Sequence, residues 1–252
     1  MIVRPGGWGF RVVRQADHAR LAGRMLALFR LPELLEHPRR EELLRAVAEH
    51  DNGWWEEDAA PRLDPGSGGP LDFRAIPDPV RRSIWRRGVE RYAALEPFVA
   101  ALVAGHYLRL ARRVLDDPDH AEEAAALAAR RDELFEAAGV ERATGIEDDR
   151  WLALGDALSL AASTGDPGFL QLPGWRAELH ETPGALEMRL DPLPLAGATR
   201  FELDQRTLSG RFADAVALGR ALATAPTRRA AIRLVPFAVR GSSAESCQRV
   251  EA

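Results

Sequence analysis

The histidines and aspartates are the residues whose types and spacing could do chemistry. His50 and Asp51 are adjacent in EHDNGWW, His18 lies 32 residues before His50, and His106 and Asp156 follow in the apolar stretches LVAGHYLRL and LALGDALSL. An ionisable group in such a stretch is costly to bury unless it is paired or bound to a metal. Neighbouring side chains point about 100° apart within a helix, but at a helix end both can converge on one ion. Imidazole and carboxylate ligands suit divalent transition metals, so the five residues predict a shared metal site.

Each of these residues also has an ordinary structural explanation when it is taken alone. His18 and His50 could be polar residues at helix ends, stabilised by the helix dipole. Asp51 could accept backbone hydrogen bonds in a turn, His106 could be a hydrogen-bonded core histidine, and Asp156 could pair with an arginine. Their order along separate helical segments favours the shared site, which we expect to hold one or two divalent ions (Mn, Fe, Co, Ni, Zn or Mg).

Four further residues are candidates for substrate binding. Asp58 and Asp72 lie, with Asp64, in residues 56–79, a stretch with five prolines and three glycines that predicts a long loop. The sequence favours a turn at Asp64, whereas Asp58 and Asp72 could equally stabilise turns or line a lid or rim over the site. Arg82 belongs to an arginine cluster at a helix start, which could meet a phosphate or form a solvated face. Trp54 could cover the site, although packing is the favoured explanation.

The elements that must position these residues are mostly helical. Apolar periodicity predicts helices over 16–30, 39–50, 80–115 with a break near Pro97, 119–138 and 147–163. Residues 2–4 and 9–14 predict a hairpin, and β-rich segments separated by Pro and Gly follow Pro167, with a helix-compatible piece within 209–224. We therefore expect a mainly α fold in one domain, 1–252. Its helical core spans about 15–165, a small β-rich layer about 170–240, and a polar tail 241–252.

Composition restricts the classes of function. All 34 basic residues are arginine, so a Schiff-base lysine and a P-loop lysine are excluded. The net charge of −4 argues against a general nucleic-acid binder. The apolar stretches are too short to span a bilayer, there is no apolar signal-peptide core, and the single cysteine, Cys247, allows no internal disulfide. We expect a cytoplasmic protein whose oligomeric state the sequence leaves open.

The order His18, His50-Asp51 in HDNG, and Asp156 in GDALSL resembles the HD-domain phosphohydrolase superfamily. This resemblance implies an HD-like helical core with one or two divalent metals, and His106 lies where two-metal members place an additional His. The stretches MIVRP, QADHARLAG, HDNGW and PRLDPGSGGPLDF also look like an uncharacterised bacterial family with HD-like features, over about residues 1–110.

The resemblance implies a metal-dependent phosphohydrolase acting on a small phosphate mono- or diester, such as a nucleotide-like substrate. Asp51 would be the catalytic carboxylate, bridging the ions if two are bound. One alternative is an HD-like di-iron oxygenase, in which His106 is an added ligand. The other is an inactive HD-like protein that binds a metabolite or a partner.

Overall fold

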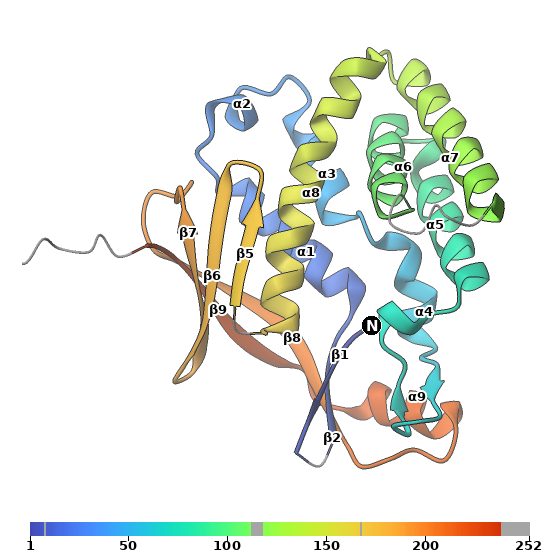
Figure 1. The fold of residues 1–252 in the computed structure, drawn as a ribbon, viewed down its shortest axis with the longest axis vertical. Helices are drawn as coiled ribbons and strands as arrows, with labels where there is room; N and C mark the ends of the chain where they lie inside the picture. Colours follow the sequence, from blue (N-terminus) through green and yellow to red (C-terminus); the bar gives the residue numbers. More distant parts are fainter. Residues whose placement is uncertain (8, 112–117, 167, 238–252) are drawn as a thin grey trace, which may run out of the picture.

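The computed structural model describes residues 1–7, 9–111, 118–166 and 168–237 (Figure 1). The tail predicted for 241–252 lies outside this range. The α-helices are α1 (Gln15–Ala27), α2 (Pro32–Leu35), α3 (Arg40–Ala48), α4 (Trp55–Ala59), α5 (Asp78–Ala93), α6 (Pro97–Ala111), α7 (Pro118–Ala137), α8 (Arg142–Thr164) and α9 (Ala215–Thr224). Two 3-10 turns, η1 (Asn52–Trp54) and η2 (Phe73–Ala75), precede α4 and α5 respectively. The predicted break at Pro97 is confirmed, because α6 begins there.

Seven strands form one mixed sheet in the order β1-β2-β8-β9-β7-β6-β5. They are β1 (Ile2–Gly6), β2 (Gly9–Val13), β5 (Gly168–Leu172), β6 (Trp175–Thr182), β7 (Ala185–Asp191), β8 (Thr199–Ser209) and β9 (Arg228–Pro236). β7 and β9 are parallel, and the other neighbouring strands are antiparallel.

This sheet corrects the expected fold class. A mainly α fold with a separate hairpin and a small C-terminal β layer is wrong, because the N-terminal hairpin is joined to the C-terminal strands. β2 pairs with β8, so that Phe10 lies opposite Leu208. Alternation along a strand shows which face is buried but does not identify a pairing partner about 200 residues away. The number of strands in the sheet could therefore not be predicted from the sequence.

The stretch 56–79 is more ordered than the expected loop. It contains most of α4, the turn η2, and a two-stranded sheet of β3 (Leu63–Asp64) and β4 (Gly69–Pro70). Asp64 makes the turn expected of it, since its carboxylate accepts hydrogen bonds from the N–H groups of Gly66 and Ser67, both at 3.1 Å.

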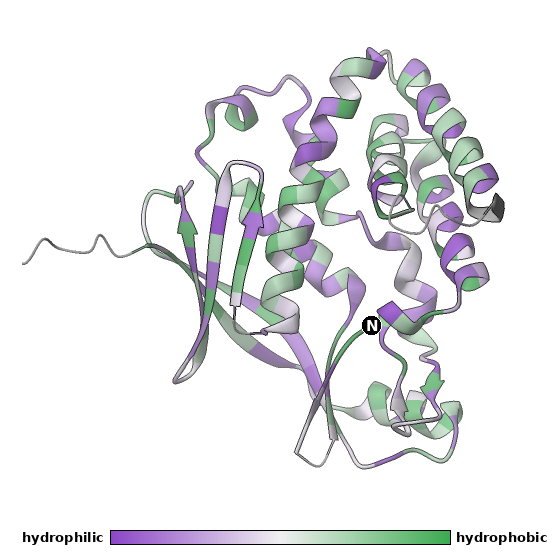
Figure 2. Cartoon of the chain, viewed as in Figure 1, coloured by the Kyte–Doolittle hydropathy of each residue, from purple (hydrophilic) through white to green (hydrophobic). Residues whose placement is uncertain are grey.

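Helices α1 and α8 lie between the sheet and the remaining large helices (Figure 1). α1 packs on α3, α8 and β8, and α6 packs on α3, α5, α7 and α8. Figure 2 shows α6 mostly in the colours of hydrophobic residues, as its burial requires. Among the described residues, no helix is long and apolar enough to cross a membrane.

Candidate metal centre

Four elements bring the five predicted residues together. His18 comes from α1, His50 and Asp51 from the turn after α3, His106 from α6 and Asp156 from α8. The three imidazoles are at most 1% exposed, and the two carboxylates are buried or nearly so. Two triads, His18–His50–Asp51 and His50–His106–Asp156, each place their potential ligand atoms within 4.8 Å of one another and could hold a metal ion.

Asp51 is the central carboxylate of the cluster. Its Oδ2 lies 2.8 Å from Nε2 of His18 and 3.9 Å from Nε2 of His50, and its Oδ1 lies 4.0 Å from Nε2 of His106. Asp156 comes from α8, and its Oδ1 lies 3.5 Å from Nε2 of His50. The ring nitrogens and carboxylate oxygens are therefore concentrated in one small volume.

The turn that carries His50 and Asp51 is held against α5. Because α3 ends at Ala48, the two residues follow in non-helical backbone, and both side chains can face one point. Gly53 allows the close approach, since a Cβ there would lie 2.2 Å from the backbone oxygen of Ile84. Two arginines of α5 and the amide of Asn52 complete the contact through backbone carbonyls.

His18 and His50 have the orientation of metal-binding imidazoles. Nδ1 of His50 lies 2.7 Å from the carbonyl oxygen of Val47, so Nδ1 carries the proton and Nε2 faces the cluster. Nδ1 of His18 lies 3.0 Å from Oγ of Ser159, whose hydroxyl donates to the carbonyl of Asp156 at 3.2 Å, so this oxygen accepts from His18. Such outward N–H donation fixes the tautomer of a histidine that binds a metal through its other nitrogen.

Sequence reasoning missed Ser159. The available signal was its spacing, since residues three apart in a helix lie on one face and Ser159 follows Asp156 by three residues. Serine is common on helix surfaces, however, and nothing in the sequence marks this one as fully buried, which the structure shows it to be.

The chemistry of the cluster fits a cation. Nε2 of His50 is buried without a hydrogen-bond partner among the described residues, although carboxylates of Asp51 and Asp156 lie within 4 Å. Burial lowers the pKa of His50, but these carboxylates and the Val47 carbonyl outweigh it and raise the pKa to about 9. The same attraction, acting against burial, lowers the pKa of both carboxyl groups. In the metal-free protein, a proton on His50 thus supplies the positive charge between the two carboxylates that a bound metal ion would otherwise supply.

A cavity of about 230 Å³ opens onto the cluster. Aromatic rings and arginines surround the metal-site residues in its wall, which is lined by Gln15, His18, Asp51, Trp54, Phe73, Arg74, Arg81, Trp85, His106, Leu110, Asp156 and Leu160. Gln15 is 2% exposed, and its Oε1 has no hydrogen-bond partner among the described residues. The wall therefore combines an apolar surface with positive charge and a free buried acceptor.

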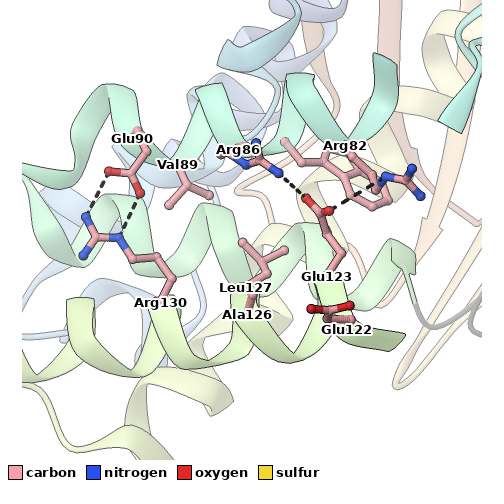
Figure 3. A pocket seen from close by; sticks show the side chains of 10 residues that line it. Arg82, Arg86, Val89, Glu90, Glu122, Glu123, Ala126, Leu127 and Arg130 are labelled. Carbon is pink, nitrogen blue, oxygen red and sulfur yellow. Dashed lines mark hydrogen bonds and ion pairs between the residues drawn. The ribbon is translucent and has the colours of Figure 1, made fainter. Parts of the chain in front are cut away.

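Of the four expected substrate-binding residues, the structure places Trp54 in the cavity wall and the other three outside it. Asp58 is buried beside the start of α1, where it accepts from the N–H of Ala16. Asp72 caps η2 and accepts from the N–H of Val3 at 3.0 Å. Arg82 lines a different cavity, between α5 and α7, where it lies 3.8 Å from Glu123 (Figure 3).

The fold and the cluster define a protein with helices packed on a mixed sheet and with a buried His/Asp centre. The chain matches the family described as "Protein of unknown function (DUF3891)" over residues 1–206, and it belongs to this family. The expected uncharacterised family is thus confirmed, whereas no comparison links the chain to the HD-domain superfamily. No curated protein and no solved structure matches the chain.

Proposed function

We propose that this protein is a metal-dependent phosphohydrolase acting on a small phosphate ester. The observation that carries the proposal is the buried Nε2 of His50, which has no hydrogen-bond partner in the part of the chain that the structure describes. This nitrogen faces the carboxylates of Asp51 and Asp156, which line a cavity whose wall contains arginines. The order of His18, His50, Asp51 and Asp156 along the chain, which resembles that of HD-domain phosphohydrolases, supports the same reaction class.

In this proposal, His18, His50, Asp51 and Asp156 hold the ion. A divalent metal supplies Lewis acidity toward a phosphoryl oxygen and a water nucleophile near neutral pH. The hydrogen bonds from His18 to Ser159 and from His50 to the carbonyl of Val47 in α3 keep both rings in place before the ion arrives. Such preorganisation lowers the cost of binding.

The rest of the cavity selects the substrate. Arg81 provides positive charge for an anion, whereas the charge of Arg74 is paired with Asp72 at 2.7 Å. Apolar surface for the organic group comes from Trp54, Phe73 and Trp85. The volume of about 230 Å³ is below the range of drug-sized ligand sites. These features favour a small phosphorylated molecule over a nucleic acid.

The test begins with metal analysis of protein purified without a His-tag or added metal, followed by assays against phosphomonoesters and phosphodiesters. We expect bound divalent metal and hydrolysis that a chelator abolishes. His50→Gln should lose both the metal and the activity. A protein that binds none of Mn, Fe, Co, Ni or Zn, or that hydrolyses no phosphate ester when loaded, would contradict the proposal.

Arg81 and Arg82 offer a matched pair for testing the cavity. Arg81 lines it, whereas its neighbour Arg82 lines the cavity between α5 and α7. A hydrogen bond to a charged group contributes about 1.5–3 kcal/mol, so Arg81→Gln should raise KM by about 10- to 100-fold and Arg82→Gln should change it little. Equal changes in KM for the two substitutions would show that Arg81 does not contact the substrate.

A further inference from the structure

His106 differs from the other two histidines of the cluster in the partner of its outward nitrogen. Nη2 of Arg109 lies 2.7 Å from Nδ1 of His106, and Nη1 of the same arginine pairs with the carboxylate of Asp149 in α8. A guanidinium group has donors only and does not lose its proton in proteins. Nδ1 of His106 is therefore the acceptor in this hydrogen bond.

The proton of His106 must then lie on the nitrogen that faces the cluster. A ring nitrogen that accepts a hydrogen bond carries no proton, so the ring of His106 has its only proton on the other nitrogen. With Nδ1 accepting from Arg109, that proton is on Nε2, which lies 4.0 Å from Oδ1 of Asp51. A protonated ring nitrogen has no lone pair for a metal.

The partners of His18 and His50 produce the opposite arrangement. Their outward Nδ1 atoms face the hydroxyl oxygen of Ser159 and the carbonyl oxygen of Val47, both of which accept. Nε2 of His18 lies 2.8 Å from Oδ2 of Asp51 and donates to it in the metal-free chain, but with Nδ1–H held by an acceptor each inward Nε2 can give up its proton to an ion. The cluster thus contains two imidazoles whose outward partners permit a lone pair at Nε2 and one whose outward partner does not.

We propose that His106 is not a metal ligand but donates a hydrogen bond from Nε2 to an oxygen of the bound phosphate ester, so that the centre holds one ion. His106 lines the cavity, where such an oxygen would lie. Arg109 is a positioning residue that acts through the tautomer of His106. The identity of the ligand rests on the function proposed above, whereas the position of the proton does not.

Nuclear magnetic resonance tests the position of the proton directly. Histidine ring nitrogens labelled with ¹⁵N report which of the two carries hydrogen, and His106→Leu identifies the resonances of His106. In the full chain, both metal-free and loaded with diamagnetic Zn²⁺, we expect the Nε2–H form for His106. The Zn²⁺-loaded chain should show the Nδ1–H form for His18 and His50. An Nδ1–H form of His106 would overturn the proposal.

Metal stoichiometry gives a second test, with His50→Leu as the matched control. We expect one Zn²⁺ per chain in the wild type and in His106→Leu, with affinities within about threefold, and at least 100-fold weaker binding in His50→Leu. Two ions in the wild type, or loss of the ion in His106→Leu, would overturn the single-ion centre. If the wild type binds no metal, the proposed function fails, while the tautomer of His106 in the metal-free chain still decides the placement of the proton.

Inorganic phosphate is the probe for the hydrogen bond to the ligand. A hydrogen bond to a charged group corresponds to about a 10-fold or larger change in affinity, so the Zn²⁺-loaded His106→Leu protein should bind phosphate at least 10-fold more weakly. Arg109→Met should behave similarly, whereas Arg109→Lys retains a donor and should stay close to the wild type. Unchanged phosphate affinity in His106→Leu would show that Nε2 does not contact the ligand.

Discussion

Replacement of Ser159 by alanine should weaken the metal centre without removing any of its ligands. Ser159 is fully buried, and its Oγ accepts the Nδ1–H of His18 at 3.0 Å. Alanine leaves this N–H without a partner and also removes the hydrogen bond from the hydroxyl to the carbonyl of Asp156. The ring of His18 would then be free to rotate or to keep its proton on Nε2, the nitrogen that donates to Oδ2 of Asp51 at 2.8 Å.

The expected magnitude follows from these two lost hydrogen bonds. A buried donor left unsatisfied costs about 1–3 kcal/mol, so the melting temperature of the metal-free protein should fall by roughly 2–12 °C, given about 2–4 °C per kcal/mol for a chain of this size. Loss of the group that orients a metal-binding histidine typically lowers metal affinity 10- to 100-fold. Ser159→Ala should therefore show a Zn²⁺ affinity reduced within that range.

Ser163→Ala is the control, because Ser163 lies one turn further along α8. Its Oγ donates to the carbonyl of Ser159 at 2.7 Å, and it is also buried, but among the described residues its hydroxyl makes no hydrogen bond to the cluster. Competition with a chromogenic chelator measures the affinity of each variant, and thermal unfolding measures its stability. Equal Zn²⁺ affinity in Ser159→Ala and the wild type would refute the orientation assigned to His18, even if Ser159→Ala were less stable.

Two further predictions concern the turn and the charge of the cluster. Gly53→Ala should destabilise the protein by about 1–3 kcal/mol or more, because the added Cβ meets a backbone carbonyl of α5 at 2.2 Å. Gly219 is in helix α9, and a Cβ there would meet no described atom within 4 Å, so Gly219→Ala should instead stabilise the protein by about 0.5–1 kcal/mol. Denaturant unfolding in which Gly53→Ala is as stable as Gly219→Ala would contradict the close packing of the turn. In the metal-free protein, the pKa of His50 is raised from 6.5 to about 9, so the stability from its protonated ring is complete below pH 6.5 and is lost as the pH rises through about 9. The free energy of unfolding should therefore be lower at pH 9 than at pH 6.5, and this difference should disappear in His50→Gln and in the metal-loaded protein. A difference of the same size in His50→Gln would show that another group causes the pH dependence.

The sequence contains enough to gather the cluster but not to assign the role of each member. His18, His50, Asp51, His106 and Asp156 could be grouped because each is a polar residue within or at the end of an apolar helical segment, and burial of several such residues favours a common site. The helix boundaries were close for the same reason, since apolar periodicity determines which face is buried. Both inferences depend on local pattern.

Features that depend on contacts between distant segments could not be obtained in this way. The pairing of β2 with β8 determines the extent of the sheet, and the side-chain directions of Arg81 and Arg82 determine that only Arg81 lines the cavity at the cluster. Asp58 and Asp72 were plausible rim residues by type, but Asp58 binds the N-terminal ammonium and a backbone N–H of α1, and Asp72 binds Arg74 and a backbone N–H of β1. Residue type gives the range of chemistry, and only the tertiary partner selects one possibility from it.

His106 shows this most clearly, because its role depends on a single contact. A histidine in the middle of a buried helix can bind a metal, donate a hydrogen bond or only pack, and neighbouring sequence does not separate these roles. Arg109 lies three residues further along α6, a spacing that places the two side chains on one helix face, and Asp149 of α8 holds the guanidinium in place. Because an arginine can only donate, this contact converts His106 from a potential ligand into a donor. Where a buried histidine adjoins a candidate metal site, the partner of its outward nitrogen is therefore more informative about its role than its distance from the ion.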